Sequence, residues 1–219
     1  MTHTNDLHHI TSDGFGFIHE MCEAAAHTGV HDEEPSPQEL ADDWFGEDEV
    51  SVFKGGSGAR RVCEFPDELL HLDRFEEDRK NHDTRYVLKF ADRPVPQNYT
   101  EVTLWSEDAH HLFAPILAWD GAYRWLLMKR LTPISPHEGD MAYLQSGQEY
   151  YHDPDVGKEV EEILEEDGYK IDDPEINTAY NEFHDLVQLM DYGGVSRKGE
   201  EMEIPAWVTA TDYDWENEE

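Results

Sequence analysis

Residues 85–90 read Arg-Tyr-Val-Leu-Lys-Phe, a run of β-branched and aromatic side chains that is typical of a strand. A helix is predicted next, from Gln97 to Leu112, because apolar side chains recur there every three to four residues. Two further strands are predicted at 115–119 and 123–128, and Asp120-Gly121 between them is a strong hairpin signal. The middle of the chain therefore combines antiparallel strands with one amphipathic helix.

Two short strands are predicted upstream, at residues 50–53 and 61–65, on either side of a glycine-rich loop. Together these segments predict an α+β fold, with an antiparallel sheet of about five strands, one packed helix and then a smaller, mostly helical lobe. We expect four parts along the chain, namely an N-terminal helical extension at 1–49, the sheet-bearing lobe at 50–131, a reduced helical lobe at 132–205 and an acidic tail at 206–219.

Helix signals flank the sheet region on both sides. Ser36-Pro37-Gln38-Glu39 is a capping box with proline at the first helical position, and residues 17–27 carry apolar side chains on one face. Farther along, an apolar face recurs between residues 156 and 164, and Gly168 stands where a helix C-terminus belongs.

The charge of the chain is extreme, since 51 acidic and 16 basic side chains give a formal net charge of −35 over 219 residues. Nucleic-acid binding is not expected, because no large basic surface is available to contact phosphates. At molar salt the Debye length is about 3 Å, so the self-repulsion of such a chain is screened. Acid excess with scarce lysine is typical of cytoplasmic proteins of salt-accumulating archaea and their viruses. The competing interpretation is an acidic mimic of DNA.

Composition also bears on the remaining classes. There is no apolar run of about 18 residues, so no membrane span is expected, and there is no pattern of a secretory signal. Cys22 and Cys63 are too few for a disulfide framework or a four-thiolate zinc site. Some of the 13 histidines could suggest a metal site, namely His3, His8, His9, His27, His31, His110 and His111. No companion Cys or Glu cluster has zinc-ligand spacing, so the histidines are expected mostly on the solvated surface.

The order of the parts is strand, glycine loop, strand, strand with a lysine, helix with a glutamate, hairpin, hinge, helix, polar loop, strand and Asp-aromatic-Gly. This order resembles the protein-kinase-like fold, and most closely the small, divergent kinase-like proteins of phage and prophage genomes. The resemblance covers about residues 50–195. Its motifs are Gly55-Gly56-Ser57-Gly58, Val87-Leu88-Lys89, Ile171 to Asn177 and Met190-Asp191-Tyr192-Gly193.

The resemblance implies Mg-ATP binding between two lobes and phosphoryl transfer to a hydroxyl group. Lys89 would clamp the phosphates and Glu101 would orient Lys89. Asp172 would accept the proton of the acceptor hydroxyl. Asn177 and Asp191 would hold Mg²⁺ through their oxygen atoms. Asp191 lies fourteen positions after Asn177, an interval that suits two strands of a hairpin carrying both metal ligands.

The resemblance further implies that a loop and a hinge contact the nucleotide. The candidates are Gly56, Ser57, Gly58, Met128 and Arg130. Glycines allow backbone N–H groups to approach phosphates closely, and Arg60 or Arg61 offers a positive charge. Met128 would wall the adenine pocket, and the backbone around Arg130 would bond the adenine ring.

The sequence departs from the kinase pattern in several places. Arg61 stands where the third glycine of the loop would fall, and Pro174 stands where a basic residue usually follows the catalytic Asp. Lys170-Ile171 stand where His-Arg usually precedes the catalytic Asp, and little chain follows Asp191, so we expect a C-terminal lobe truncated relative to full protein kinases. The alternative is therefore a catalytically inactive pseudokinase, or a viral or regulatory structural protein. It would dock a protein partner through the N-terminal helices or through the aromatic side chains of the tail, Trp207, Tyr213 and Trp215.

Overall fold

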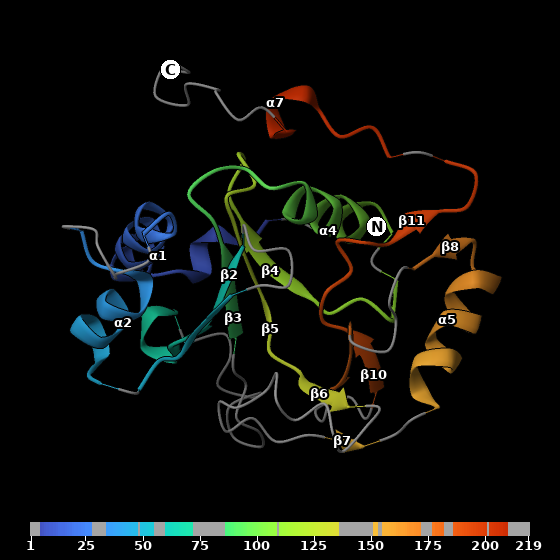
Figure 1. Ribbon diagram of the computed structural model, residues 1–219, viewed down its shortest axis with the longest axis horizontal. Coiled ribbons are helices and arrows are strands. Elements are labelled where there is room, and N and C mark those ends of the chain that lie inside the picture. Colours follow the sequence, from blue (N-terminus) through green and yellow to red (C-terminus); the bar gives the residue numbers. More distant parts are fainter. Residues whose placement is uncertain are drawn as a thin grey trace.

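Figure 1 shows the computed structural model of the chain. It describes residues 5–27, 34–47, 49–54, 60–71, 86–108, 110–135, 151–152, 155–171, 177–181, 186–200 and 202–209.

An antiparallel sheet with the strand order β1-β2-β3-β5-β4 forms the centre of the fold. Its strands are β1 (Val52–Lys54), β2 (Arg61–Phe65), β3 (Tyr86–Phe90), β4 (Ile116–Trp119) and β5 (Trp125–Lys129). The predicted five-stranded sheet and its hairpin are confirmed. In the middle strand, Lys89 pairs with Val62 on one side and with Leu126 on the other.

Helix α4 (Pro96–Glu107) packs against one face of the sheet. The prediction that this helix continues to Leu112 is wrong, because the backbone leaves the helical conformation at Asp108. The chain then turns, and the N–H of Phe113 donates to the carbonyl of His110 at 2.8 Å. The apolar stripe is also narrower than expected, since the buried face of α4 includes the polar Asn98 and Glu101. These two side chains are part of the candidate site described below.

Helices α1 (Ser12–Ala24) and α2 (Pro37–Phe45) lie at the opposite face of the sheet (Figure 1). The capping box at Ser36 is confirmed, with Ser36 and Glu39 each accepting the other's backbone N–H. Phe17, Met21 and Cys22 of α1 share one apolar core with sheet residues that include Leu88. The segment predicted as an extension therefore covers the sheet, whose middle strands are buried on both faces.

Beyond residue 131, the described residues form six short strands and two helices. A sheet of order β10-β9-β6-β7 and a β11-β8 pair stand beside α5 (Val156–Glu166), whereas a short α7 (Ala206–Thr209) lies near α4. The strands are β6 (Thr132–Ser135), β7 (Tyr151–His152), β8 (Tyr169–Lys170), β9 (Thr178–Asn181), β10 (Leu186–Leu189) and β11 (Ser196–Arg197). The prediction of a mostly helical lobe is wrong for these segments, because short apolar runs do not distinguish a strand from a helix by periodicity alone.

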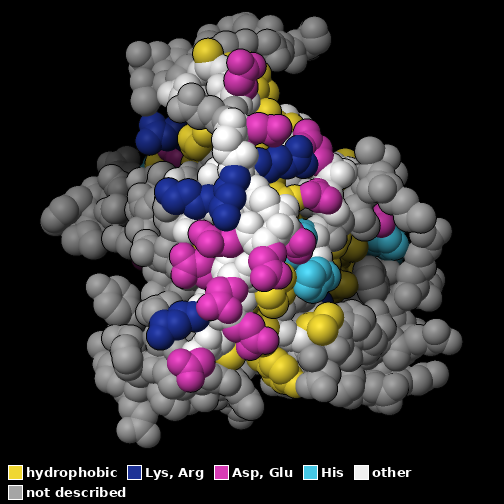
Figure 2. Space-filling view, turned by 90° about the vertical axis from the view of Figure 1, so that its right-hand side faces the viewer, with side chains coloured by type: hydrophobic (Ala, Val, Ile, Leu, Met, Phe, Trp, Pro, Cys, Tyr) yellow, Lys and Arg dark blue, Asp and Glu magenta, His cyan; other side chains and the backbone are white. Residues whose placement is uncertain are grey.

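The face on which α5 lies shows how the acidic residues are accommodated (Figure 2). Val156, Val160 and Leu164 point into the core, while Glu162 and Glu166 are exposed. Acidic side chains gather on this face with Lys and Arg side chains among them. Within the described residues, no helix combines the length and apolar character needed to cross a membrane.

Candidate functional site

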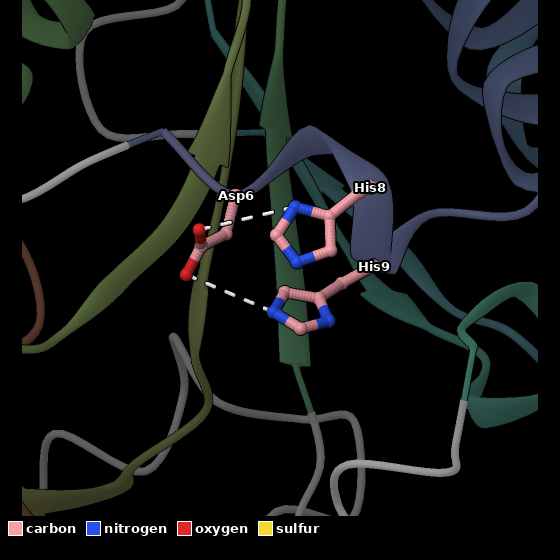
Figure 3. A group of neighbouring side chains, drawn as sticks. All are labelled: Asp6, His8 and His9. Atoms are coloured by element: carbon pink, nitrogen blue, oxygen red, sulfur yellow. Dashed lines mark ion pairs between the residues drawn. The ribbon is translucent and has the colours of Figure 1, made fainter.

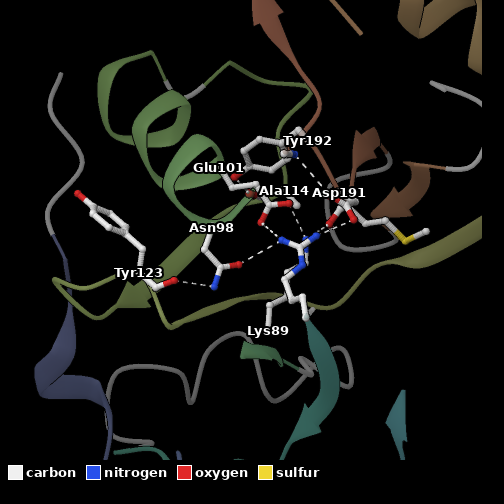
Figure 4. Close-up of polar contacts among 10 residues, drawn as sticks. Lys89, Asn98, Glu101, Ala114, Tyr123, Asp191 and Tyr192 are labelled. Atoms are coloured by element: carbon white, nitrogen blue, oxygen red, sulfur yellow. Dashed lines mark hydrogen bonds and ion pairs between the residues drawn. The ribbon is translucent and has the colours of Figure 1, made fainter. Parts of the chain in front are cut away.

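Lys89 of β3 and Glu101 of α4 form a buried ion pair (Figure 4). Nζ of Lys89 lies 2.8 Å from Oε1 of Glu101 and donates to the carbonyl oxygen of Met190 at 2.7 Å. The Glu101 side chain has no exposed surface. The structure thus brings together the two residues that the sequence paired. Because both charges are removed from water, loss of either partner would leave a buried charge, which is far costlier than loss of a surface pair.

Arg60 supplies a second buried cation at the same place. Its Nη1 lies 3.1 Å from Oε2 of Glu101 and 3.2 Å from Oδ1 of Asn98, and its Nη2 lies 2.7 Å from Oδ2 of Asp191. Asn98 is held in turn by a hydrogen bond from its Nδ2 to the carbonyl of Tyr123, at 3.1 Å. One planar guanidinium therefore joins α4 to the Asp191 segment, a geometry that suits arginine better than lysine.

The Asp191-Tyr192-Gly193 segment is fixed against the core by its aromatic residue. The fully buried Tyr192 ring stacks on Phe113 with centroids 4.6 Å apart, and its hydroxyl donates to the carbonyl of Ala114 at 3.0 Å. On the other side, a Cβ added at Gly193 would stand only 2.8 Å from Cβ of Gln97 on α4. The segment is thus clamped between α4 and the chain that enters β4, which aims Asp191 at Arg60.

Asn177 directly precedes β9, and Asp191 follows the end of β10, so both lie at the open end of the β9-β10 hairpin. Strands β9 and β10 pair antiparallel from Thr178 and Leu189 inward, and the N–H of Met190 donates to the carbonyl of Asn177 at 2.8 Å. The interval between Asn177 and Asp191 was predicted to suit a hairpin, and the hairpin is confirmed. Asn177 and Asp191 thus lie at the same end of the paired strands, and carboxylate and amide oxygens are donors of the kind that Mg²⁺ prefers.

Burial and charge act against each other in this cluster. Burial lowers the pKa of Lys89 and raises the pKa of Glu101, because each loses the water that stabilises its charged form, although their mutual attraction opposes both shifts. Burial also opposes ionisation of Asp191, but the positive charges of Lys89 and Arg60 outweigh it and hold the pKa of this carboxyl well below its usual range. Asp191 is therefore a carboxylate at neutral pH.

The two hinge candidates lie on β5 and directly after it. Met128 is buried within the core on the α4 side of the sheet. Arg130 follows β5, and its Nη1 lies 2.6 Å from Oε1 of Glu64 on β2. The contacts of these two residues are with Glu64 and with the apolar core, so their roles toward a nucleotide stay predictions. The candidates Gly56, Ser57, Gly58 and Asp172 lie outside the described residues, as does most of the aromatic tail.

Sequence reasoning did not place Arg60 and Asn98 among the site residues. Arg60 was noted only as one of two arginines that could offer charge after the glycine loop, and nothing local distinguishes it from Arg61. Asn98 occupies a helix position that reads as an ordinary polar one. The available signal was a polar residue three positions before Glu101, which places both on one face of a helix.

No model of a protein family matches the sequence, and no curated protein matches it. Among solved structures, distant and partial similarity is found to WbdD, described as a bifunctional kinase-methyltransferase. Its high-resolution crystal structure is 20% identical, with a TM-score of 0.41 over 68% of this chain and 33% of that chain. The medium-resolution structure is 21% identical, with a TM-score of 0.40 over 72% of this chain and 35% of that chain. The chain thus spans about a third of the WbdD chains that it matches.

Proposed function

We propose that this chain is a kinase-like protein that binds Mg-ATP at the cluster of Lys89, Glu101 and Asp191. The observation that carries the proposal is the buried Lys89–Glu101 pair, whose Lys89 also bonds the carbonyl of Met190, directly before Asp191. A lysine held by a helix glutamate beside a carboxylate is the arrangement that phosphoryl-transfer sites use to neutralise phosphates and hold metal. A buried polar cluster of this kind is costly to maintain, which supports a functional role.

In this proposal each side chain has one task. Lys89 contacts phosphate oxygens, and Glu101 keeps its ammonium in place. Asp191 and Asn177 hold Mg²⁺, an ion that would neutralise charge on the phosphates. Asp172 takes the proton of the acceptor hydroxyl while the bond from phosphorus to the bridging oxygen of the nucleotide breaks and the bond to the acceptor oxygen forms. Catalysis would rest on positioning and electrostatics.

The oxygen donors of Asp191 and Asn177 fit magnesium, but Arg60 competes with the ion for the Asp191 carboxylate. Asp191 offers a carboxylate of low pKa, but its Oδ2 already accepts from Arg60 at 2.7 Å, and its Oδ1 accepts from the N–H of Gly193 at 3.4 Å. Metal would therefore bind Asp191 in competition with Arg60. This contact favours a second candidate function, in which the cluster is a structural lock in an inactive, kinase-like binding module.

The test is nucleotide affinity measured by calorimetry on the full chain in molar KCl, with and without Mg²⁺. The variant is Lys89→Met, which keeps the length of the side chain and removes its charge. Lys198→Met is the matched control, because Lys198 is also near a glutamate, with Nζ 3.8 Å from Oε2 of Glu165, but is largely exposed. Circular dichroism verifies that all three proteins are folded.

The wild type and Lys198→Met are expected to bind ATP, and Lys89→Met to bind it at least about tenfold more weakly, as follows from loss of a charged hydrogen bond. Equal affinity in a folded Lys89→Met, or no binding at millimolar ATP, would overturn the proposal. Phosphoryl transfer separates the two functions. An active wild type with a silent Asp172→Ala supports the enzyme, whereas nucleotide binding without turnover supports the inactive module.

We propose in addition that the chain works in a cytoplasm of high salt. The net charge of −35 supports this, because compaction of such a chain is opposed by self-repulsion at low ionic strength.

A further inference from the structure

A cluster of one carboxylate and two imidazoles lies far from the Lys89 site in the sequence, near the N-terminal end of the described chain. Asp6, His8 and His9 offer three ligand atoms that all lie within 4.8 Å of one another. Figure 3 shows the Asp6 carboxylate facing both rings. We propose that these three side chains bind one divalent transition-metal ion, with Zn²⁺ as the fitting ion. The proposal is independent of the nucleotide site.

The distances between the ligand atoms suit an ion rather than direct bonds. Oδ1 of Asp6 lies 4.0 Å from Nδ1 of His8, and Oδ2 of Asp6 lies 3.7 Å from Nε2 of His9. Both separations exceed hydrogen-bond length. Ligand atoms around a tetrahedral Zn²⁺ with bonds of about 2.1 Å stand roughly 3.4 Å apart. A small rotation of the exposed His8 ring and of the carboxylate would close the remaining difference.

The backbone that carries these ligands is fastened on two sides. The 3₁₀ helix η1 (Leu7–His9) follows Asn5, whose side chain exchanges two hydrogen bonds with the backbone of Trp119 on β4, at 2.7 and 3.1 Å. The N–H of Asp6 donates to the carbonyl of Leu117 at 3.2 Å, and the carbonyl of His9 accepts from His71 at 2.7 Å. The ligands thus stand on a short turn pinned to the sheet, which reduces the cost of ordering them around an ion.

Burial of the three side chains differs in a way that suits a surface site. His9 is nearly buried, with 8% of its side chain exposed, whereas His8 is 55% and Asp6 is 40% exposed. A buried imidazole fixes one ligand, and the open side leaves a coordination position for water. Neutral imidazole nitrogens with one carboxylate form a donor set that selects Zn²⁺, Co²⁺ or Ni²⁺ over Mg²⁺ or Ca²⁺. The bound ion would rigidify the turn at residues 6–9, which hydrogen bonds hold to β4, and would so stabilise the fold.

The test uses Zn²⁺ alone as the probe, titrated into the full chain by calorimetry. Millimolar Mg²⁺ is present throughout to occupy weak, non-specific sites, because 51 acidic side chains bind any divalent ion weakly. The variants are Asp6→Asn and His8→Ala, both at exposed positions that should leave the fold intact. The control is His19→Ala, because His19 on α1 is an exposed histidine with Nε2 3.3 Å from Oε1 of Glu23.

We expect one saturable Zn²⁺ site in the wild type and in His19→Ala. Affinity should fall at least tenfold in Asp6→Asn and in His8→Ala. Zn²⁺ should raise the melting temperature of the first two proteins and not of the last two, and Co²⁺ should give the visible absorption of a tetrahedral site only in the first two. The proposal fails if the wild type shows no saturable site, or if the variants of Asp6 and His8 bind Zn²⁺ as tightly as the wild type.

Discussion

Arg60 and Asp191 are 131 positions apart in the chain, yet Nη2 of Arg60 lies 2.7 Å from Oδ2 of Asp191. Arg60 directly precedes β2 and Asp191 follows β10, so this one contact ties the first half of the central sheet to the chain beyond the β9-β10 hairpin. Since Nη1 of the same guanidinium bonds Glu101, Arg60 balances charge for two carboxylates at once. The cluster of Lys89, Arg60, Glu101 and Asp191 is therefore neutral when all four groups are charged.

Replacement of Arg60 should destabilise the fold severely. Arg60→Met leaves Glu101 and Asp191 with Lys89 as their shared cation, and breaking a buried pair of this kind costs about 3–5 kcal/mol. Urea unfolding followed by circular dichroism measures the loss. The control is Arg61→Met, because Arg61 is the neighbouring arginine on β2 but is only half-buried. Equal stability of the two variants would contradict a structural role for the Arg60 contacts.

The close approach of Gly193 to α4 gives a second, sharper comparison. Gly193→Ala places a Cβ 2.8 Å from Cβ and 3.0 Å from Cα of Gln97, and the second of these atoms is backbone that cannot move aside alone. We expect a loss of about 1–3 kcal/mol of unfolding free energy, as for other overpacked sites. Gly194→Ala is the matched control, because a Cβ there meets nothing within 4 Å. A neutral Gly193→Ala would show that α4 and the Asp191 segment are not packed as described.

Alkaline pH should unfold the protein partly through Cys22. Burial raises the pKa of this thiol from its ordinary 9.0 to about 12. A thiol whose pKa is higher in the folded chain contributes stability that is complete below pH 9 and is lost between pH 9 and 12, because only the unfolded chain releases its proton there. In this range the free energy of unfolding falls by up to about 1.4 kcal/mol per pH unit.

The measurement is the free energy of unfolding in urea at pH 8, 9, 10 and 11, for the wild type and for Cys22→Ala. Tyrosines also titrate in this range, so the informative quantity is the difference between the two proteins. The difference in unfolding free energy should narrow steadily above pH 9, because the wild type loses the stability that its neutral thiol contributes and Cys22→Ala has no thiol there to ionise. Parallel curves would show that Cys22 is not buried as a neutral thiol.

Salt should stabilise the chain, with most of the gain at moderate concentrations. Self-repulsion at a net charge of −35 is screened as the Debye length falls from about 10 Å at 0.1 M to about 3 Å at 1 M. We therefore expect the thermal midpoint to rise steeply up to about 1 M KCl and little beyond. NaCl at the same ionic strength is the control and should give the same curve, since screening does not depend on the identity of the cation. A midpoint independent of salt would remove the support for a high-salt cytoplasm.

The residues of the candidate site differ in how far the sequence could predict their positions. The pairing of Lys89 with Glu101 was expected from the resemblance to the protein-kinase-like fold, in which a strand lysine pairs with a glutamate of the following helix. Asn177 and Asp191 were expected at the two ends of one hairpin, because the interval of fourteen positions from one to the other suits two paired strands. Arg60 and Asn98 were not assigned to the site, because their burial depends on contacts with residues much farther along the chain.

Local physics determined the central elements of this protein before any tertiary contact was considered. Alternating and β-branched side chains set β2 and β3, Asp120-Gly121 set the β4-β5 hairpin, and Ser36 with Glu39 set the start of α2, since each depends on neighbours in sequence. Only the tertiary structure decided that α1 and α2 cover the sheet and that Arg60 contacts both Glu101 and Asp191. These outcomes depend on which apolar surfaces and charges meet across long separations, and the free energy of such contacts is absent from any single segment.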